Sequence, residues 1–227
     1  MDLVKLFQIW DKLSAYVTEI CHDRNPDHGH EHMQTVAYNT LKILQSENIN
    51  CQKTWQDAIV VAWLHDVADH KYDYNGKLKE NMHQFITKIV DNPTLIIDII
   101  ERISYSKEVK IGTDDWEIVL GKYGCLIRNI VSDADKLEAL GINGFNRCVE
   151  YTKYNYVKKF GHEIPHDILK KNVLDHANDK LLKLKDFYIK TESGKKIAGK
   201  LHQELIFCLE SPDFRKKIIL FFIYQIT

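Results

Sequence analysis

The 227-residue sequence predicts an all-α protein. Apolar residues recur at three- and four-residue spacing along most of the chain, which is the helical period, and no segment alternates as a strand does. Only 10 glycines and 4 prolines interrupt this pattern. The length and the 44% hydrophobic content suffice for one large core, and neither a repeat nor a long linker divides the chain. We therefore expect a single domain over residues 1–227.

Three apolar stripes place the first helices. The first two stripes consist of Leu3, Phe7, Trp10, Leu13 and Val17, and then of Met33, Val36, Ala37, Thr40, Leu41 and Leu44. A third helix is predicted over about 53–69, and its apolar face includes His65. Residues three and four apart share one face of a helix, so each stripe should face the core.

Caps and helix breakers mark the later helices. Asn92 can cap a helix that begins at Pro93, and Gly141 can terminate the helix that contains ADKLEAL. Another helix follows the Gly112-Thr113 pair. After a break near 161–165, two long helices are predicted in HDILKKNVLDHANDKLLKLKDFYI and SGKKIAGKLHQELIFCLE. Ser211-Pro212 then opens a last helix.

Charge and composition exclude several classes of function. The 31 basic and 32 acidic residues nearly cancel, so no global field favours long nucleic acid or an anionic membrane. The N-terminus lacks the apolar region of a secretory signal, and the longest apolar run, 218–224, is too short to span a membrane and is expected to be a buried last helix. Five cysteines without a CxxC pair indicate reduced thiols in the core. We expect a cytoplasmic protein with a small-molecule partner; the sequence carries no signal of an oligomeric state.

Histidines are concentrated in the first third of the chain. Six of the 11 fall between residues 22 and 70, and His28, His30 and His32 lie in HGHEH. Alone, this cluster could equally be a solvated surface tract, and His30 is expected at the surface. His65 lies on an apolar face, however, and the carboxylate of Asp66 beside it is costly to bury without a positive partner such as a metal ion. The alternative is a pair at a helix C-terminus, with the carboxylate in water.

Two more carboxylates, Asp133 and Asp135, follow the apolar segment that ends at Val131. Either could be only a helix N-cap. Because both are present, one can cap a helix while the other binds a metal.

The pattern H…HD…D, formed by His32, His65-Asp66 and Asp135, resembles the motif that names the HD superfamily of metal-dependent phosphohydrolases. Four segments resemble, in order, a bacterial-type subfamily of small HD hydrolases that includes nucleotide pyrophosphohydrolases: AWLHDVADHKYD, ISYSKE, VSDADKLEALGINGF and HANDKLLKLKDFYIKTESGKKIAGKLHQEL. The resemblance covers about residues 27–210. It implies an HD-domain helical bundle with one divalent metal ion bound by His32, His65, Asp66 and Asp135, and with Asp133 as a neighbouring acceptor behind these ligands.

Two imidazoles and two carboxylates suit Mn²⁺, Fe²⁺, Co²⁺, Ni²⁺ or Zn²⁺ better than a metal that prefers thiolate ligands. Mg²⁺ is a further candidate. By the resemblance, Asp69 occupies the position of an acidic catalytic residue that orients water or accepts its proton. His28 can hydrogen-bond a phosphate or help activate water if the helix already runs there, one turn before His32. Relatives often carry His-Asp where this chain has His28-Gly29, so one carboxylate is missing here.

A polyphosphate requires positive groups, because two carboxylate ligands cancel the charge of a dication. Lys71 and Lys136 directly follow the metal motifs and are the candidates, with Arg128 a weaker one. Three tyrosines could stack a base, but at such spacing they are more often packing residues: Tyr72, Tyr74 and Tyr105.

The resemblance implies hydrolysis of nucleoside triphosphates to monophosphate and pyrophosphate by a metal-activated water. Alternatives are a nucleoside monophosphate phosphatase, a cyclic-nucleotide or alarmone phosphodiesterase, and a non-catalytic nucleotide-sensing HD module. The intact ligand set argues against the sensing module, and the missing carboxylate at Gly29 argues mildly for it.

Overall fold

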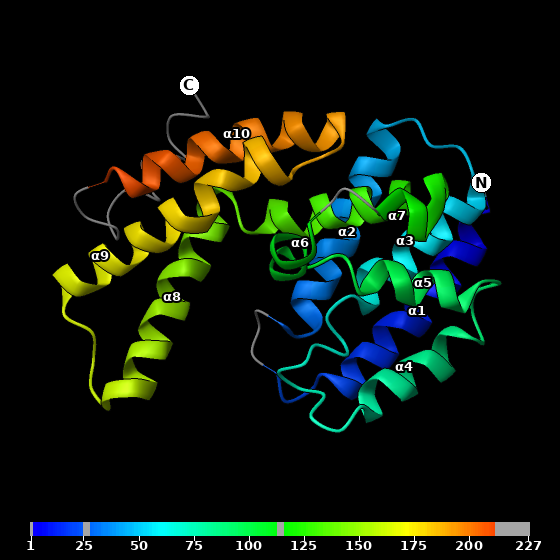
Figure 1. Cartoon of the computed structure of the whole chain (residues 1–227), viewed down its shortest axis with the longest axis horizontal. Helices are drawn as coiled ribbons and strands as arrows, with labels where there is room; N and C mark the ends of the chain where they lie inside the picture. The colour runs from blue at the N-terminus through cyan, green and yellow to red at the C-terminus, as the bar shows by residue number, and fades with distance from the viewer. Residues whose placement is uncertain (1, 25–27, 113–115, 212–227) are drawn as a thin grey trace. The chain divides into compact units, whose positions relative to one another are not determined.

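The computed structural model describes residues 2–24, 28–112 and 116–211, and these residues form helices joined by turns, without a strand (Figure 1). The predicted all-α fold is confirmed. Among the described helices, none combines the length with the apolar composition that a membrane-spanning helix requires. The predicted last helix, with its apolar run 218–224, lies outside the described residues.

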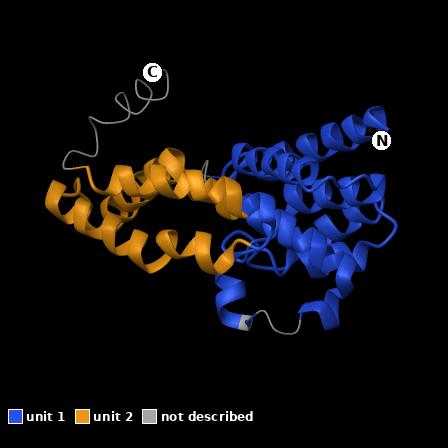
Figure 2. Ribbon diagram, turned by 90° about the horizontal axis from the view of Figure 1, so that it is seen from above, with its two compact units in different colours: residues 1–135, 190–194 blue, residues 136–189, 195–227 orange. Residues whose placement is uncertain are grey.

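The chain divides into two compact units, residues 1–135 with 190–194 and residues 136–189 with 195–227 (Figure 2). The expected single domain over residues 1–227 stays a prediction. The first unit contains α1 (Leu3–Ile20), α2 (His30–Ser46), α3 (Gln52–Leu64), α4 (Lys77–Ile86), α5 (Pro93–Ile100), α6 (Tyr105–Ile111) and most of α7 (Trp116–Glu138). The second contains α8 (Gly141–Phe160), α9 (His166–His176), the π-helical turns η2 (Ala177–Leu181) and η3 (Leu184–Tyr188), and most of α10 (Glu192–Leu209).

Helix α3 forms the centre of the first unit. It packs against α1, α2 and α5, and ten of its thirteen residues are buried. A helix that is covered on all sides needs apolar residues around its whole circumference, which AIVVAWL at its C-terminal end supplies. This helix ends at Leu64, earlier than the predicted end near Asp69, and so delivers His65 and Asp66 to a buried turn.

The predicted core face of α1 is wrong in its first two turns. Leu3 and Phe7 are 53% and 66% exposed, whereas Leu6 and Ile9 are buried together with Leu13 and Val17. Two apolar stripes overlap on this helix and share its C-terminal half. The packing partners, rather than the period of α1 itself, decide which stripe faces the core.

One predicted helix cap is confirmed, and two further helices differ from the prediction. Asn92 Oδ1 accepts a hydrogen bond from Leu95 N at 3.2 Å, as the predicted cap before Pro93. Helix α7 runs to Glu138 through Asp133 and Asp135, with a kink at Gly121 where φ is 65° and ψ is 172°. These aspartates therefore lie inside a helix and cap none. The first of the two long helices predicted after the break near 161–165 is shorter than expected. It ends at His176 as α9, and the π-helical turns η2 and η3 follow it.

All five cysteines are free, and Cys21, Cys148 and Cys208 are buried. Cys51 is exposed and Cys125 is half-buried, so the expectation of core positions fails for these two.

A fully buried ion pair joins α6 to α7. Arg128 Nη2 donates to Glu108 Oε2 at 2.8 Å, Arg128 Nε donates to Arg102 O at 3.0 Å, and the guanidinium lies 3.7 Å from the Trp116 ring centroid. Lys190 Nζ lies 3.6 Å from Glu108 Oε1. Both side chains of the pair are at most 1% exposed. Arg128, the weaker candidate for binding phosphate, is therefore a core residue engaged in this ion pair.

Replacing Glu108 with Ala should lower the free energy of unfolding by about 3–5 kcal/mol, because it leaves a buried guanidinium without its carboxylate. Urea unfolding measures the loss, and Glu117→Ala on the exposed surface of α7 is the matched control. The double variant Glu108→Leu with Arg128→Met should recover part of the loss. A loss no larger for Glu108→Ala than for the control would show that the pair contributes nothing.

Candidate metal centre

Four predicted ligands come from three helices of the first unit. His32 lies in the first turn of α2, His65 caps α3 and is followed by Asp66, and Asp135 lies near the end of α7. His32, His65 and Asp66 are between 4% and 8% exposed. The fold thus brings together side chains that are 33 and 69 positions apart in sequence.

The ligand atoms of these residues face one another. His32 Nε2 lies 3.1 Å from His65 Nε2. Asp135 Oδ1 lies 3.6 Å from His32 Nε2 and 3.8 Å from His65 Nε2. Asp66 Oδ2 lies 3.7 Å from His32 Nε2, and Asp66 Oδ1 lies 3.9 Å from His65 Nε2. The ligand atoms of His32, His65 and Asp66 all lie within 4.8 Å of one another.

The backbone fixes the tautomer of His65. His65 Nδ1 lies 2.8 Å from Ala62 O, and because a carbonyl can only accept, Nδ1 carries the proton. The other ring nitrogen, Nε2, then presents its lone pair to His32. Metal-binding histidines are commonly oriented by such a bond on the second nitrogen.

Electrostatics keeps Asp66 ionised. Burial alone raises the pKa of its carboxyl, but the imidazoles of His65, His28 and His32 together hold that pKa well below its usual range. Two ligands at about 2.1 Å from one cation lie about 3.0 Å apart at a right angle and about 3.4 Å apart in a tetrahedron. The observed separations of 3.1–3.9 Å match a divalent cation after contractions of a few tenths of an ångström. These residues therefore fit such an ion.

Solved structures share this architecture. One is Bacillus subtilis YpgQ, with 21% identity, 90% of this chain and 93% of that chain covered, and a TM-score of 0.61. YpgQ in complex with ADP gives 22% identity, 98% and 94% coverage, and a TM-score of 0.59. An HD-superfamily hydrolase from Bacillus thuringiensis gives 22% identity, 97% coverage of both chains and a TM-score of 0.60. The chain has the HD-domain fold. No protein-family model and no curated protein matches the sequence.

His28 contacts the cluster of predicted ligands from outside helix α2. The position of His28 one turn before His32 was predicted on the condition that the helix already runs there, and this condition is not met, because α2 begins at His30. It still reaches the site, because His28 Nδ1 lies 2.8 Å from Asp66 Oδ2. Its side chain is 28% exposed. His30, expected at the surface, is half-buried, with its Nε2 2.8 Å from Ser14 Oγ.

Asp69 and Lys71 lie in the turns that follow α3. Asp69 Oδ1 accepts a hydrogen bond from Lys71 N at 2.9 Å and lies 3.3 Å from His70 Nδ1, while the Lys71 side chain is exposed. Lys136 is only 2% exposed and begins the second unit. The catalytic role of Asp69 and the phosphate-binding roles of both lysines stay predictions.

Asp133 anchors the chain segment before α10. Its Oδ1 accepts from Lys190 N at 2.9 Å, and its Oδ2 accepts from Thr191 N and Thr191 Oγ1, both at 2.7 Å. Residues two apart on a helix point in nearly opposite directions, which separates this carboxylate from that of Asp135. A role for Asp133 behind the metal ligands stays a prediction.

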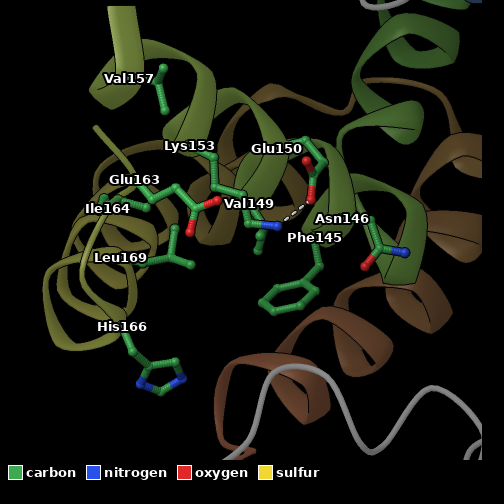
Figure 3. Close-up of a pocket in the computed structure, with 10 residues that line it drawn as sticks. All are labelled: Phe145, Asn146, Val149, Glu150, Lys153, Val157, Glu163, Ile164, His166 and Leu169. Atoms are coloured by element: carbon green, nitrogen blue, oxygen red, sulfur yellow. Dashed lines mark hydrogen bonds and ion pairs between the residues drawn. The ribbon is translucent and has the colours of Figure 1, made fainter. Parts of the chain in front are cut away.

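The second unit has a cavity of its own, of about 540 Å³, between α8, α9 and their connection (Figure 3). Phe145 and Leu169 contribute apolar surface to it, and Glu150 pairs with Lys153 at its rim. Its lining contains none of the predicted ligands.

Arg24 contacts the Asp66 turn in the first unit, although no pattern in the sequence predicts it. Its guanidinium donates to Asp66 O at 2.9 Å and to Val67 O at 2.6 Å. A single arginine in an irregular segment has no periodic or motif signal, so only the folded chain reveals this contact.

Replacing Asp66 with Asn should weaken Mn²⁺ binding by more than about 100-fold, since losing a ligand should exceed the 10–100-fold effect of losing a residue behind the ligands. Calorimetric titration of chelator-treated protein measures the affinity. Asp57→Asn is the matched control, because Asp57 is a buried aspartate of α3, the helix before the turn that carries Asp66, and it pairs instead with Lys53 and Tyr123. Equal Mn²⁺ affinity in the wild type and Asp66→Asn would contradict the site.

Proposed function

We propose that this chain is a divalent-metal-dependent phosphohydrolase of small nucleotides, which converts nucleoside triphosphates to monophosphate and pyrophosphate. One metal ion would be held by His32, His65, Asp66 and Asp135. The observation that carries the proposal is the buried pair of imidazole nitrogens 3.1 Å apart, flanked by two carboxylates. A cytoplasmic location is part of the same proposal.

The solved neighbours support the class of substrate and reaction. One of them was crystallised with ADP and another is an HD-superfamily hydrolase. The resemblance of the sequence to small HD nucleotide pyrophosphohydrolases favours triphosphates among the possible nucleotides.

A bound divalent cation would lower the pKa of water and polarise the phosphorus. The protein's own groups must then position the substrate and move protons. His28 donates through Nδ1 to the ionised Asp66, so its Nε2 is left as the basic nitrogen. We assign it the task of accepting a proton from water or, once protonated, of hydrogen-bonding a phosphate. Asp69 is the second candidate acceptor.

The charge balance of the proposed metal centre explains why lysines are needed to bind a polyphosphate. The carboxylates of Asp66 and Asp135 offset the charge of a dication, so the centre alone gives little net attraction for a polyphosphate. We assign Lys71 and Lys136 to the phosphate tail. An exposed lysine can swing toward a bound substrate, whereas the buried Lys136 would act as a fixed charge.

Incubation with a panel of nucleotides in Mn²⁺, Co²⁺ or Mg²⁺ should give pyrophosphate and monophosphate in equal amounts from triphosphates, because water adds at the α-phosphorus. Pyrophosphate and orthophosphate are measured separately, and the Asp66→Asn protein is the inactive control. Faster release of orthophosphate from monophosphates would favour a nucleotidase. Nucleotide binding without turnover would favour the sensing module.

Replacing Lys71 with Ala should raise KM for triphosphates by about 10-fold and change KM for monophosphates less, because only the longer tail reaches a second cation. Lys77→Ala, another exposed lysine of the same unit, should leave both values unchanged. Lys136→Met should act like Lys71→Ala, with its thermal unfolding followed because the side chain is buried. Equal effects on both substrate classes would remove these lysines from the phosphate site.

A further inference from the structure

Arg24 lies in the turn that follows α1 and contacts the turn that carries Asp66. Its Nη1 donates to Asp66 O at 2.9 Å and its Nη2 to Val67 O at 2.6 Å. The contact spans 42 and 43 positions of sequence, and all three residues belong to the first unit. One guanidinium therefore binds two successive carbonyls of the ligand-bearing turn.

Asp66 and Val67 lie beyond the last residue of α3, so the hydrogen bonds of that helix do not satisfy their carbonyls. A cation close to the C-terminus of a helix also interacts favourably with the helix dipole. Asp69 N donates to Asp66 O at 3.2 Å, so this carbonyl accepts from two directions. The planar fork of an arginine can bind two neighbouring acceptors at once, which the single ammonium of a lysine does less well.

Tyr72 covers the guanidinium from the far end of the same turn. Its ring centroid lies 4.3 Å from Arg24 Cζ and 6.0 Å from the centroid of His28. The chain folds back to this point through a hydrogen bond from Tyr72 N to Asp69 O at 2.8 Å. The cation–π contact holds the guanidinium against the turn.

We propose that Arg24 is a positioning residue for the metal centre, fixing the Asp66 carboxylate by bracing its backbone. The inference rests on the metal site of the proposed function. Asp66 Oδ2 is held by His28 at 2.8 Å, but a side chain can be aimed only as well as its backbone is fixed. Arg24 supplies that fixation from outside α3, and removing it lets the carboxylate drift from the position that the ion requires.

The test measures Mn²⁺ affinity by calorimetry in the full chain. Arg24→Ala should bind Mn²⁺ about 10-fold more weakly or worse, as for other residues that orient a ligand. Arg102→Ala is the matched control, because the half-buried Arg102 also donates to a helix carbonyl, Asp98 O at 2.8 Å. It should keep the wild-type affinity within about twofold. Arg24→Lys keeps the charge and should fall between the wild type and Arg24→Ala.

Two further readouts separate positioning from other roles. Saturating Mn²⁺ should restore kcat and KM of Arg24→Ala, whereas an arginine that binds phosphate would raise KM and leave Mn²⁺ affinity intact. A purely structural arginine would lower the melting temperature of the metal-free protein without changing that affinity. If Arg24→Ala does not fold, Arg24→Lys decides by the same titration. Mn²⁺ affinity within twofold of the wild type in the folded variant overturns the proposal.

The titration does not depend on turnover. Failure of the nucleotide assay with normal Mn²⁺ binding would refute the reaction and leave the role of Arg24 standing. Wild-type affinity in Arg24→Ala, together with lost affinity in Asp66→Asn, would remove Arg24 and leave the metal site. A wild-type protein that takes up no Mn²⁺ would contradict both.

Discussion

Two imidazole nitrogens, His32 Nε2 and His65 Nε2, face each other across 3.1 Å in a buried space bordered by the carboxylates of Asp66 and Asp135. The Ala62 carbonyl sets the tautomer of His65, so this imidazole cannot turn its N–H toward the other ring without losing a buried hydrogen bond. Lone pairs and negative charges gathered in this way need a proton or a cation among them. This constraint explains why a carboxylate and two imidazoles are tolerated at the end of the most buried helix of the unit.

The surrounding scaffold holds each contributor from a different side. Helix α3 is enclosed by α1, α2 and α5, which leaves its C-terminal turn little freedom. Arg24 binds the carbonyls of that turn, and His28 binds the Asp66 carboxylate itself. Two residues before Asp135, the Asp133 carboxylate accepts three hydrogen bonds from residues 190 and 191 and so restrains α7. Side chains that are held by packing and by further hydrogen bonds keep a functional site precise.

Much of this arrangement could be predicted from local patterns. The helical period predicted the all-α class, and the apolar face that ends at His65 predicted that this side chain is buried. Both predictions depend only on residues within a few turns of one another. The exposed Leu3 and Phe7 were assigned to the core because two stripes overlap on α1, and only its neighbours choose between them. Arg24 and the bonds of Asp133 escaped prediction since they join residues 42 to 58 positions apart without any periodic signal. The sequence did not show that α7 continues through Asp133 and Asp135, so the directions of these two carboxylates could not be predicted.

We expect one divalent cation to bind between α2, the end of α3 and α7. Crystals grown with Mn²⁺, with diffraction data collected at a wavelength where manganese scatters anomalously, would locate this ion. We predict a single strong anomalous peak in this unit, about 2.1–2.3 Å from His32 Nε2, His65 Nε2 and one oxygen each of Asp66 and Asp135. A peak elsewhere, or coordination by Asp133 in place of Asp135, would contradict it.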